Sequence, residues 1–171
     1  MSWVDEVKAN IPDYAKDIRL NLDAVINRNG LDEVDAHACA YAAAVAGGNE
    51  DLAFEITVDG PLKGTPECDA AKAAAALMGM NNVYYPFVEM ADDPDLKGLP
   101  PGLRMSAYAN HGGVSKKKFE MYALCASIVG KCHFCVKNHY DVLKAEGMTL
   151  TELQAVGKIA AVVNAVSKAT V

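Results

Sequence analysis

Two cysteines three positions apart, followed by a histidine, are the residues of this sequence best suited to chemistry. Cys132 and Cys135 form a Cys-x-x-Cys pair, and His139 follows on the same stretch. An α-helix turns by about 100° per residue, so the three side chains fall on one face, within roughly 60° of one another. Glu120 is the nearest upstream acid that could join them from a preceding helix. The pattern therefore places a base one helical turn from a dithiol.

A dithiol beside a base suits redox chemistry at sulfur. The thiolate is the nucleophile, and a cysteine in the first turn of a helix is stabilised as thiolate by exposed N–H groups and the positive dipole end. Peroxide reduction needs this thiolate, a second thiol and a proton donor. The thiolate attacks one peroxide oxygen, the leaving oxygen takes a proton, and the resulting sulfenic acid condenses with the second thiol. Glu120 and His139 could carry the protons.

Zinc binding is the main alternative for the same residues. Cys132, Cys135 and His139, with Cys125 or His133, would supply suitable ligands. Structural zinc sites normally have a second well-spaced pair of ligands, which this sequence lacks. A Cys-x-x-Cys pair with no function is the remaining interpretation. We therefore expect no metal and no bound cofactor, only a redox-active disulfide.

The other cysteines and the loop histidine are weaker candidates. Cys39, Cys68 and Cys125 lie among apolar residues, and we expect them to be buried small hydrophobes. His111 precedes the helix that carries Glu120 and is expected in a surface loop. His133 either helps to orient the dithiol or faces water.

Length and composition indicate one ordinary globular domain. The chain has 171 residues and a net charge of −6, and no long basic run indicates a nucleic-acid partner. The three lysines at 116–118 are expected on a solvated helix face. No apolar run approaches the 18 or so residues that span a membrane. The first residues are acidic where a signal peptide would be basic, so we expect a cytoplasmic protein with reduced cysteines.

Helix start signals recur along the chain and predict an all-α fold. Pro66 follows Thr65 at one expected helix start, Ser115 can cap a helix that runs to Val129, and Thr149 with an acid three residues later forms a capping box. Residues 56–58, Ile-Thr-Val, leave a short strand as an alternative for one segment.

A shift of the sequence by 83 residues suggests an internal repeat. It lays Gly47 on Gly130 and Gly64 on Gly147, as two copies of one helical hairpin would. We divide the single domain 1–171 into a first half at about 1–90, a connecting loop at about 91–113 and a catalytic half at about 114–171.

Only the second copy has the reactive residues. In the first copy Asn49, Leu52 and Ile56 occupy the places of the two cysteines and His139. His37 corresponds to Glu120, and we expect it on the polar surface.

Several segments resemble those of the alkyl hydroperoxide reductase D (AhpD) family, within the wider carboxymuconolactone decarboxylase-like group. The resemblance covers nearly the whole chain, and a Cys-x-x-Cys joined to an upstream Glu is more specific than the cysteines alone. The segments that carry it are Ile11–Ile18, Met78–Tyr84, Pro101–Met105, Phe119-Glu120 and the Cys132-x-x-Cys135-x-x-x-His139 signature. The chain departs from the family pattern at Phe134, where members often have a histidine; here His133 stands one place earlier.

The resemblance implies an all-α fold of two similar helical halves, assembled as a homotrimer. It implies that Cys135 is the peroxidatic cysteine that becomes sulfenic acid. Cys132 would then be the more exposed resolving cysteine, which donates a proton and meets the reductant. Glu120 and His139 would form the proton relay.

For function, the resemblance implies an antioxidant peroxidase that reduces alkyl hydroperoxides through a Cys132/Cys135 cycle. A lipoylated dehydrogenase component would regenerate it. The alternative is a thiol-disulfide adaptor that passes electrons to a peroxiredoxin and has little peroxidase activity of its own. Lactone decarboxylation, as in other members of the wider group, does not need the Cys-x-x-Cys pair and is disfavoured.

Overall fold

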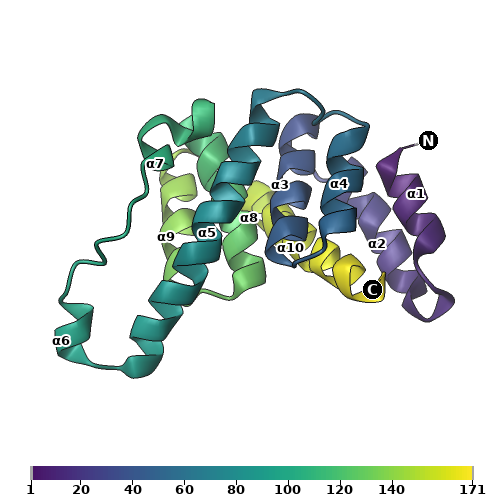
Figure 1. Ribbon diagram of the computed structural model, residues 1–171. Coiled ribbons are helices and arrows are strands. Elements are labelled where there is room, and N and C mark those ends of the chain that lie inside the picture. Colours follow the sequence, from purple (N-terminus) through teal and green to yellow (C-terminus); the bar gives the residue numbers. More distant parts are fainter. Residues whose placement is uncertain (1, 171) are drawn as a thin grey trace.

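The computed structural model describes residues 2–170, and every regular element within them is a helix (Figure 1). The predicted all-α fold is therefore confirmed. The elements, in chain order, are α1 (Trp3–Asn10), η1 (Asp13–Ala15), α2 (Lys16–Asn27), α3 (Glu33–Ala46), α4 (Glu50–Val58), α5 (Pro66–Ala91), α6 (Pro94–Lys97), α7 (Ala107–Asn110), η2 (His111–Gly113), α8 (Lys116–Gly130), α9 (His133–Ala145) and α10 (Leu150–Ala169), where η denotes a 3-10 helix.

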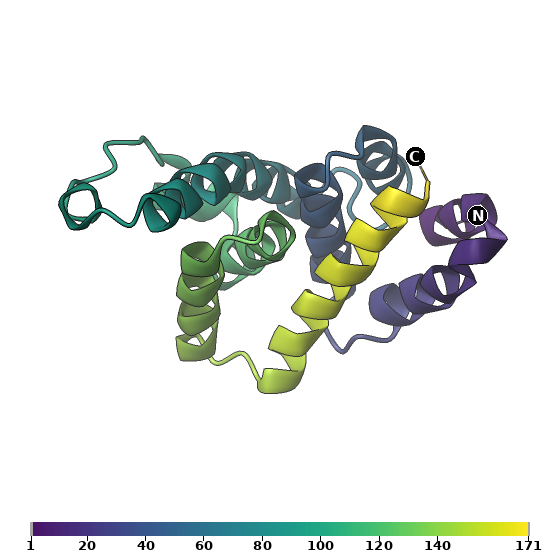
Figure 2. The same cartoon turned by 90° about the horizontal axis from the view of Figure 1, so that it is seen from below.

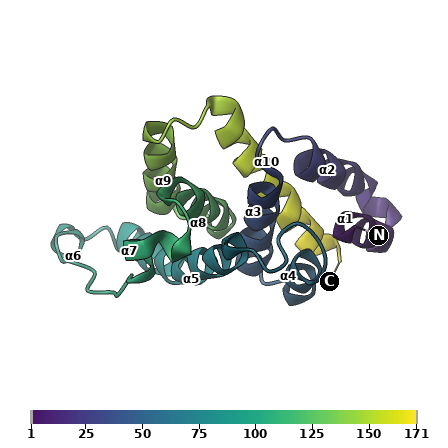
Figure 3. The ribbon, with the colours of Figure 1, turned by 90° about the horizontal axis from the view of Figure 1, so that it is seen from above.

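The central helices α3 and α8 pack against each other and against both α5 and α10. Residues 35–44 of α3 and 119–127 of α8 are buried without interruption. The α3 stretch is rich in alanine, which allows helices to approach closely, and the α8 stretch contributes larger side chains such as Phe119 and Tyr122 to the core. Figures 2 and 3 show α10 between the α8–α9 pair and the α1–α2 pair. The core thus lies around α3 and α8, and α8 is the helix that carries Glu120.

Helix ends follow the cap signals of the sequence. Ser115 accepts a hydrogen bond from the backbone N–H of Lys118, and the Thr149 capping box is formed with Glu152. Thr65 caps α5 in the same way. These caps satisfy N–H groups that the first turn of a helix leaves without partners.

Two details of the predicted elements are corrected. Residues 56–58 belong to α4, so the strand alternative is wrong; the hydroxyl of Thr57 bonds to the Ala53 carbonyl one turn earlier. The connection at 91–113 is not a plain loop, because it contains α6, α7 and η2.

The helix starts repeat along the chain. Helices α8, α9 and α10 begin 83, 83 and 84 residues after α3, α4 and α5. This spacing follows the offset of the sequence repeat, while the division of the domain into two equivalent halves stays a prediction.

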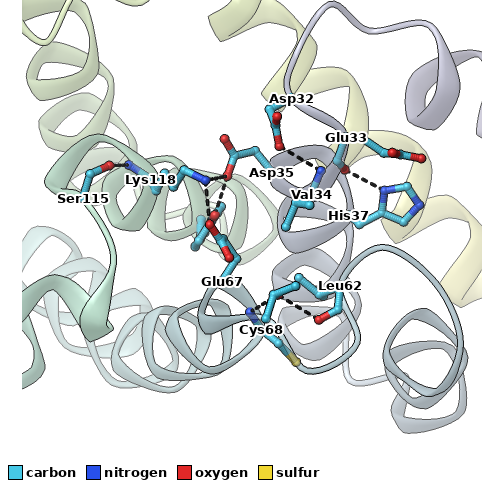
Figure 4. A network of polar contacts seen from close by, with 12 residues as sticks. Asp32, Glu33, Val34, Asp35, His37, Leu62, Glu67, Cys68, Ser115 and Lys118 are labelled. Carbon is cyan, nitrogen blue, oxygen red and sulfur yellow. Dashed lines mark hydrogen bonds and ion pairs between the residues drawn. The ribbon is translucent and has the colours of Figure 1, made fainter.

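One of the three lysines at 116–118, Lys118, is partly buried and paired with two carboxylates rather than on the solvated face that we expected (Figure 4). The ammonium of Lys118 lies 2.7 Å from Glu67 Oε1 on α5 and 3.3 Å from Asp35 Oδ1 on α3. The hydroxyl of Tyr122 donates to the same Asp35 oxygen at 2.5 Å. Burial opposes the charge of Lys118, but its hydrogen bonds to the two carboxylates outweigh this and raise its pKa, while that of Glu67 is lowered. The network ties α3, α5 and α8 together.

His37 also differs from the expectation of a polar surface residue. Its side chain is buried, at 4% exposure. Its ring packs edge-on against Trp3 of α1, and Nδ1 lies 2.7 Å from the Glu33 carbonyl oxygen. The surface prediction was wrong because α1, which covers this part of α3, is distant in sequence.

Candidate active site

Cys132 and Cys135 are joined in a disulfide at the start of α9. Helix α8 ends at Gly130, and Lys131 takes the left-handed conformation that stops it. Cys132 is then the N-cap residue of α9, and its sulfur accepts a hydrogen bond from the Cys135 backbone N–H at 3.2 Å. The sequence placed Cys132 inside the first helical turn, whereas the structure places it one residue before that turn.

Both sulfurs face the interior, toward α5. The carbonyl oxygen of Asn81 lies 3.9 Å from Cys132 Sγ and 3.7 Å from Cys135 Sγ. Cys132 is 0% exposed and Cys135 is 3% exposed, so the expectation that Cys132 is the more exposed cysteine is wrong for this disulfide form. The physical reason is the capping role of Cys132, which turns its side chain back over the first turn of α9.

Glu120 and His139 form a buried pair next to the disulfide. The distance from His139 Nδ1 to Glu120 Oε2 is 2.5 Å, and the two residues are 3% and 5% exposed. Helix α8 brings Glu120 to this position, and α9 brings His139 one turn after Cys135. At this distance a proton must lie between nitrogen and oxygen, because two lone pairs would repel each other.

The other ring nitrogen of His139 points at a methionine. Nε2 lies 3.1 Å from Met78 Sδ on α5, and a thioether can only accept a hydrogen bond. Nε2 therefore carries a hydrogen. The mobile proton of the pair is the one between Nδ1 and Glu120.

Among residues 2–170, no hydrogen bond joins the Glu120–His139 pair to the sulfur of Cys132 or Cys135. A proton that passes between His139 and the dithiol therefore needs a rearrangement of the side chains or a bridging water.

Tyr108 is a third polar residue at the pair. It comes from α7, in the segment between α5 and α8, and its hydroxyl lies 3.5 Å from His139 Nδ1. Burial, with Glu120 nearby, raises its pKa well above the ordinary range of a tyrosine.

Sequence reasoning missed Tyr108, Met78 and Asn81 as site residues. Met78 was expected in the core, and Tyr108 has no spacing that links it to the Cys-x-x-Cys pair. Asn81 and Asn82 could have been recognised from the sequence, because two adjacent amide side chains interrupt a helix of small apolar residues. Asn82 donates to the Ala126 carbonyl at 3.2 Å and so fastens α5 to α8.

A groove of about 540 Å³ opens beside the first turn of α9. Phe134, which lies between the two cysteines in sequence, stacks on Tyr85 with ring centroids 4.3 Å apart. His133 is exposed, and its Nδ1 lies 3.0 Å from Glu89 Oε1. The groove is lined mainly by aromatic and aliphatic side chains: Tyr84, Tyr85, Val88, Glu89, Leu96, Lys97, Leu99, Pro101, His133 and Phe134.

The remaining candidates lie apart from the dithiol. Cys39, Cys68 and Cys125 are buried, as predicted, and Cys125 donates to the Cys39 carbonyl at 3.1 Å. His111 is half-buried in η2, with its ring 6.3 Å from that of Phe119. Within residues 2–170, no three or more His, Cys, Asp or Glu side chains gather as a metal-ion site would require. Over the same residues, no helix has both the length and the apolar character needed to span a membrane.

Comparisons with known proteins agree with this geometry. The profile of the carboxymuconolactone decarboxylase family matches residues 94–171, which include the whole of α8 and α9. A protein named alkyl hydroperoxide reductase AhpD from Methylocella silvestris is 39% identical over 161 residues, covering 94% of this chain and 90% of the relative. Relatives of the same name from Rhodospirillum centenum and Streptomyces avermitilis are 39% and 40% identical; the matches cover 96% and 95% of this chain and 88% and 92% of theirs. The chain therefore belongs to the AhpD family, within the carboxymuconolactone decarboxylase group.

Proposed function

We propose that this protein is an alkyl hydroperoxide reductase that works through a Cys132/Cys135 dithiol-disulfide cycle. The observation that carries the proposal is the buried disulfide at the N-terminus of α9, one turn from the Glu120–His139 pair. The names of the relatives, alkyl hydroperoxide reductase AhpD, support the same reaction.

The cycle begins with reduced cysteines. The Cys135 thiolate attacks the terminal oxygen of the hydroperoxide, and the O–O bond breaks. The alkoxide that leaves takes the proton of the Cys132 thiol and departs as an alcohol. Cys135 is now a sulfenic acid, and its sulfur has been oxidised by two electrons.

The second step closes the disulfide. The Cys132 thiolate attacks the sulfenic sulfur of Cys135, the S–O bond breaks, and the hydroxide takes a proton from the Glu120–His139 pair to leave as water. The N-cap position suits Cys132 to this task, because the Cys135 backbone N–H at 3.2 Å stabilises its thiolate. The pair then takes up a proton from solvent, so it is protonated in the disulfide form. When a dithiol later reduces the disulfide, one proton returns to solvent as Cys135 becomes a thiolate again.

A dithiol donor of the dihydrolipoyl type would return the two electrons. The donor attacks one sulfur, forms a mixed disulfide, and is released as its own cyclic disulfide. Both sulfurs are buried, so side chains must move before the donor or the peroxide reaches them, and we propose that the Phe134–Tyr85 stack beside the groove is what moves. The groove is large and apolar enough for an alkyl or lipoyl chain.

The alternative is an adaptor that delivers electrons to a peroxiredoxin. Peroxide consumption with dihydrolipoamide as sole donor, measured with and without added peroxiredoxin, separates the two functions. The proposed reductase consumes peroxide in both reactions. Turnover that appears only with the peroxiredoxin would replace the proposal by the adaptor.

From the family resemblance we also propose a cytoplasmic homotrimer. Light scattering of the purified protein checks the trimer, and a mass of one chain would contradict it.

A further inference from the structure

Tyr108 is held in place by ring contacts with Phe119 of α8 and His139 of α9. Its ring meets Phe119 edge-on at 5.0 Å and lies parallel to His139, at 6.4 Å between centroids and 13° between planes. The adjoining η2 fits tightly, because a side chain at Gly112 would place its Cβ 2.9 Å from Ala70 Cα. Tyr108 is therefore positioned by packing, with its hydroxyl over His139 Nδ1.

The Glu120–His139 pair needs a hydrogen-bond donor once it has released its proton, and the Tyr108 hydroxyl is placed to supply one. While one proton lies between Glu120 Oε2 and His139 Nδ1, both atoms are satisfied. Nε2 keeps its own hydrogen on Met78. Once the pair has released its proton, the Nδ1 lone pair and the Glu120 carboxylate face each other at short distance inside the protein. Such a state is costly unless a neutral donor reaches it.

We propose that Tyr108 is a positioning residue of the Glu120–His139 pair, and that its hydroxyl donates a hydrogen bond to the pair when the pair has released its proton. The 3.5 Å separation is one that a small movement of the tyrosine ring closes. The use of this step in turnover rests on the proposed function, while the hydrogen bond itself does not.

The surroundings keep Tyr108 a donor. Burial, and then the charges of Glu120 and Tyr85, raise its pKa well above the ordinary range, so the hydroxyl keeps its hydrogen at working pH. The titratable groups that face the pair are Tyr108 of α7, Tyr85 of α5 near that hydroxyl, and, when reduced, the two cysteines of α9. In the disulfide form the cysteines do not titrate, which leaves the two tyrosines.

The test is an NMR titration of histidine in the oxidised protein, comparing wild type with Tyr108→Phe. The substitution keeps the ring and removes only the hydroxyl. A donor to the deprotonated pair lowers the midpoint at which His139 loses its proton, so its removal raises that midpoint by about half to one pH unit. The His139 signal is assigned from its loss in His139→Gln.

Tyr140→Phe is the matched control. Tyr140 lies on α9 and, like Tyr108, is half-buried, but its hydroxyl makes no hydrogen bond among residues 2–170. We expect its midpoint to equal that of wild type. A midpoint in Tyr108→Phe that is unchanged or lower overturns the inference. Because the disulfide form is titrated, the result does not depend on peroxide turnover. An inactive wild type with the expected shift would refute the proposed function alone.

Discussion

The two cysteines have unequal surroundings at the scale of single residues. Cys132 caps α9 and accepts a backbone N–H bond, whereas Cys135 lies inside the first turn, one turn before His139. Spacing alone treats the two thiols as equivalent. Their backbone positions give a physical reason for different tasks, which single substitutions can separate.

Serine substitutions should separate the two thiols. We expect Cys135→Ser to abolish peroxide turnover, because no sulfur remains to attack the peroxide. Cys132→Ser should stop after one half-reaction and leave a sulfenic acid at Cys135 that dimedone traps and mass spectrometry locates. Full activity in both variants would refute the assignment of the dithiol. Cys68→Ser is the control, as Cys68 is buried away from the disulfide.

Glu120 Oε2 and His139 Nδ1 lie 2.5 Å apart and share the mobile proton of the pair. Glu120→Gln keeps the shape of the side chain and removes the proton carrier, so we expect the turnover rate to fall by about 10²-fold or more. Steady-state kinetics measure this, with the exposed Glu146→Gln as control. An unchanged rate in Glu120→Gln would mean that protons reach the dithiol from solvent.

At the scale of helices, the end of α8 must lie close to α5 for the site to form. Gly130 makes this approach possible, because a Cβ at this position would lie 2.2 Å from the Asn82 side-chain nitrogen. Asn82 is itself fixed by its hydrogen bond to the Ala126 carbonyl. The glycine before the Cys-x-x-Cys pair therefore does more than end a helix.

Gly130→Ala should lower the free energy of unfolding by about 1–3 kcal/mol, because the added methyl group overpacks the α5–α8 contact. Urea unfolding measures the change. Gly157→Ala on α10 is the control, since no atom lies within 4 Å of its Cβ position. That variant should be neutral or more stable by up to about 1 kcal/mol, as alanine favours a helix over glycine. Equal effects at both glycines would contradict the close-packing explanation.

Lys118 joins three helices through Asp35 and Glu67. Lys118→Met leaves two carboxylates without their cation and should lower the free energy of unfolding by about 1–3 kcal/mol at neutral pH. The pKa of Glu67 is lowered in the folded protein, mainly by the hydrogen bond from Lys118. This contribution is therefore present above the unfolded pKa of Glu67 and is lost as the pH falls through its folded pKa.

Urea unfolding at neutral and acidic pH checks this sign: the difference between wild type and Lys118→Met should shrink in acid. The exposed Lys158→Met on α10 is the control and should have little effect at either pH. A difference that grows in acid would contradict the account.

At the scale of the whole molecule, the sequence predicted those features that depend on neighbouring residues in the chain, such as the starts of helices. Caps such as Ser115 and Thr149 define helix starts by short-range hydrogen bonds, so these starts agree with the structure. The Cys-x-x-Cys spacing and the helix before it led to the residues that meet at the site.

Contacts between distant segments were not predictable in the same way. Tyr108 reaches His139 from the segment between α5 and α8, and Lys118 turns toward carboxylates on two other helices. The burial of His37 depends on α1 and that of Cys132 on α5. Each of these depends on how helices pack, which no spacing along one helix reveals.

The central claim is that a hydroperoxide oxidises Cys132 and Cys135 to a disulfide with each other. A thiol count of the fully reduced protein, before and after one equivalent of tert-butyl hydroperoxide, tests it most directly, with peptide mass mapping of the product. The account predicts a fall from five free thiols to three, with Cys39, Cys68 and Cys125 still free and one peptide joined through Cys132 and Cys135. Five remaining thiols, or a disulfide that involves any of the other three cysteines, would contradict it.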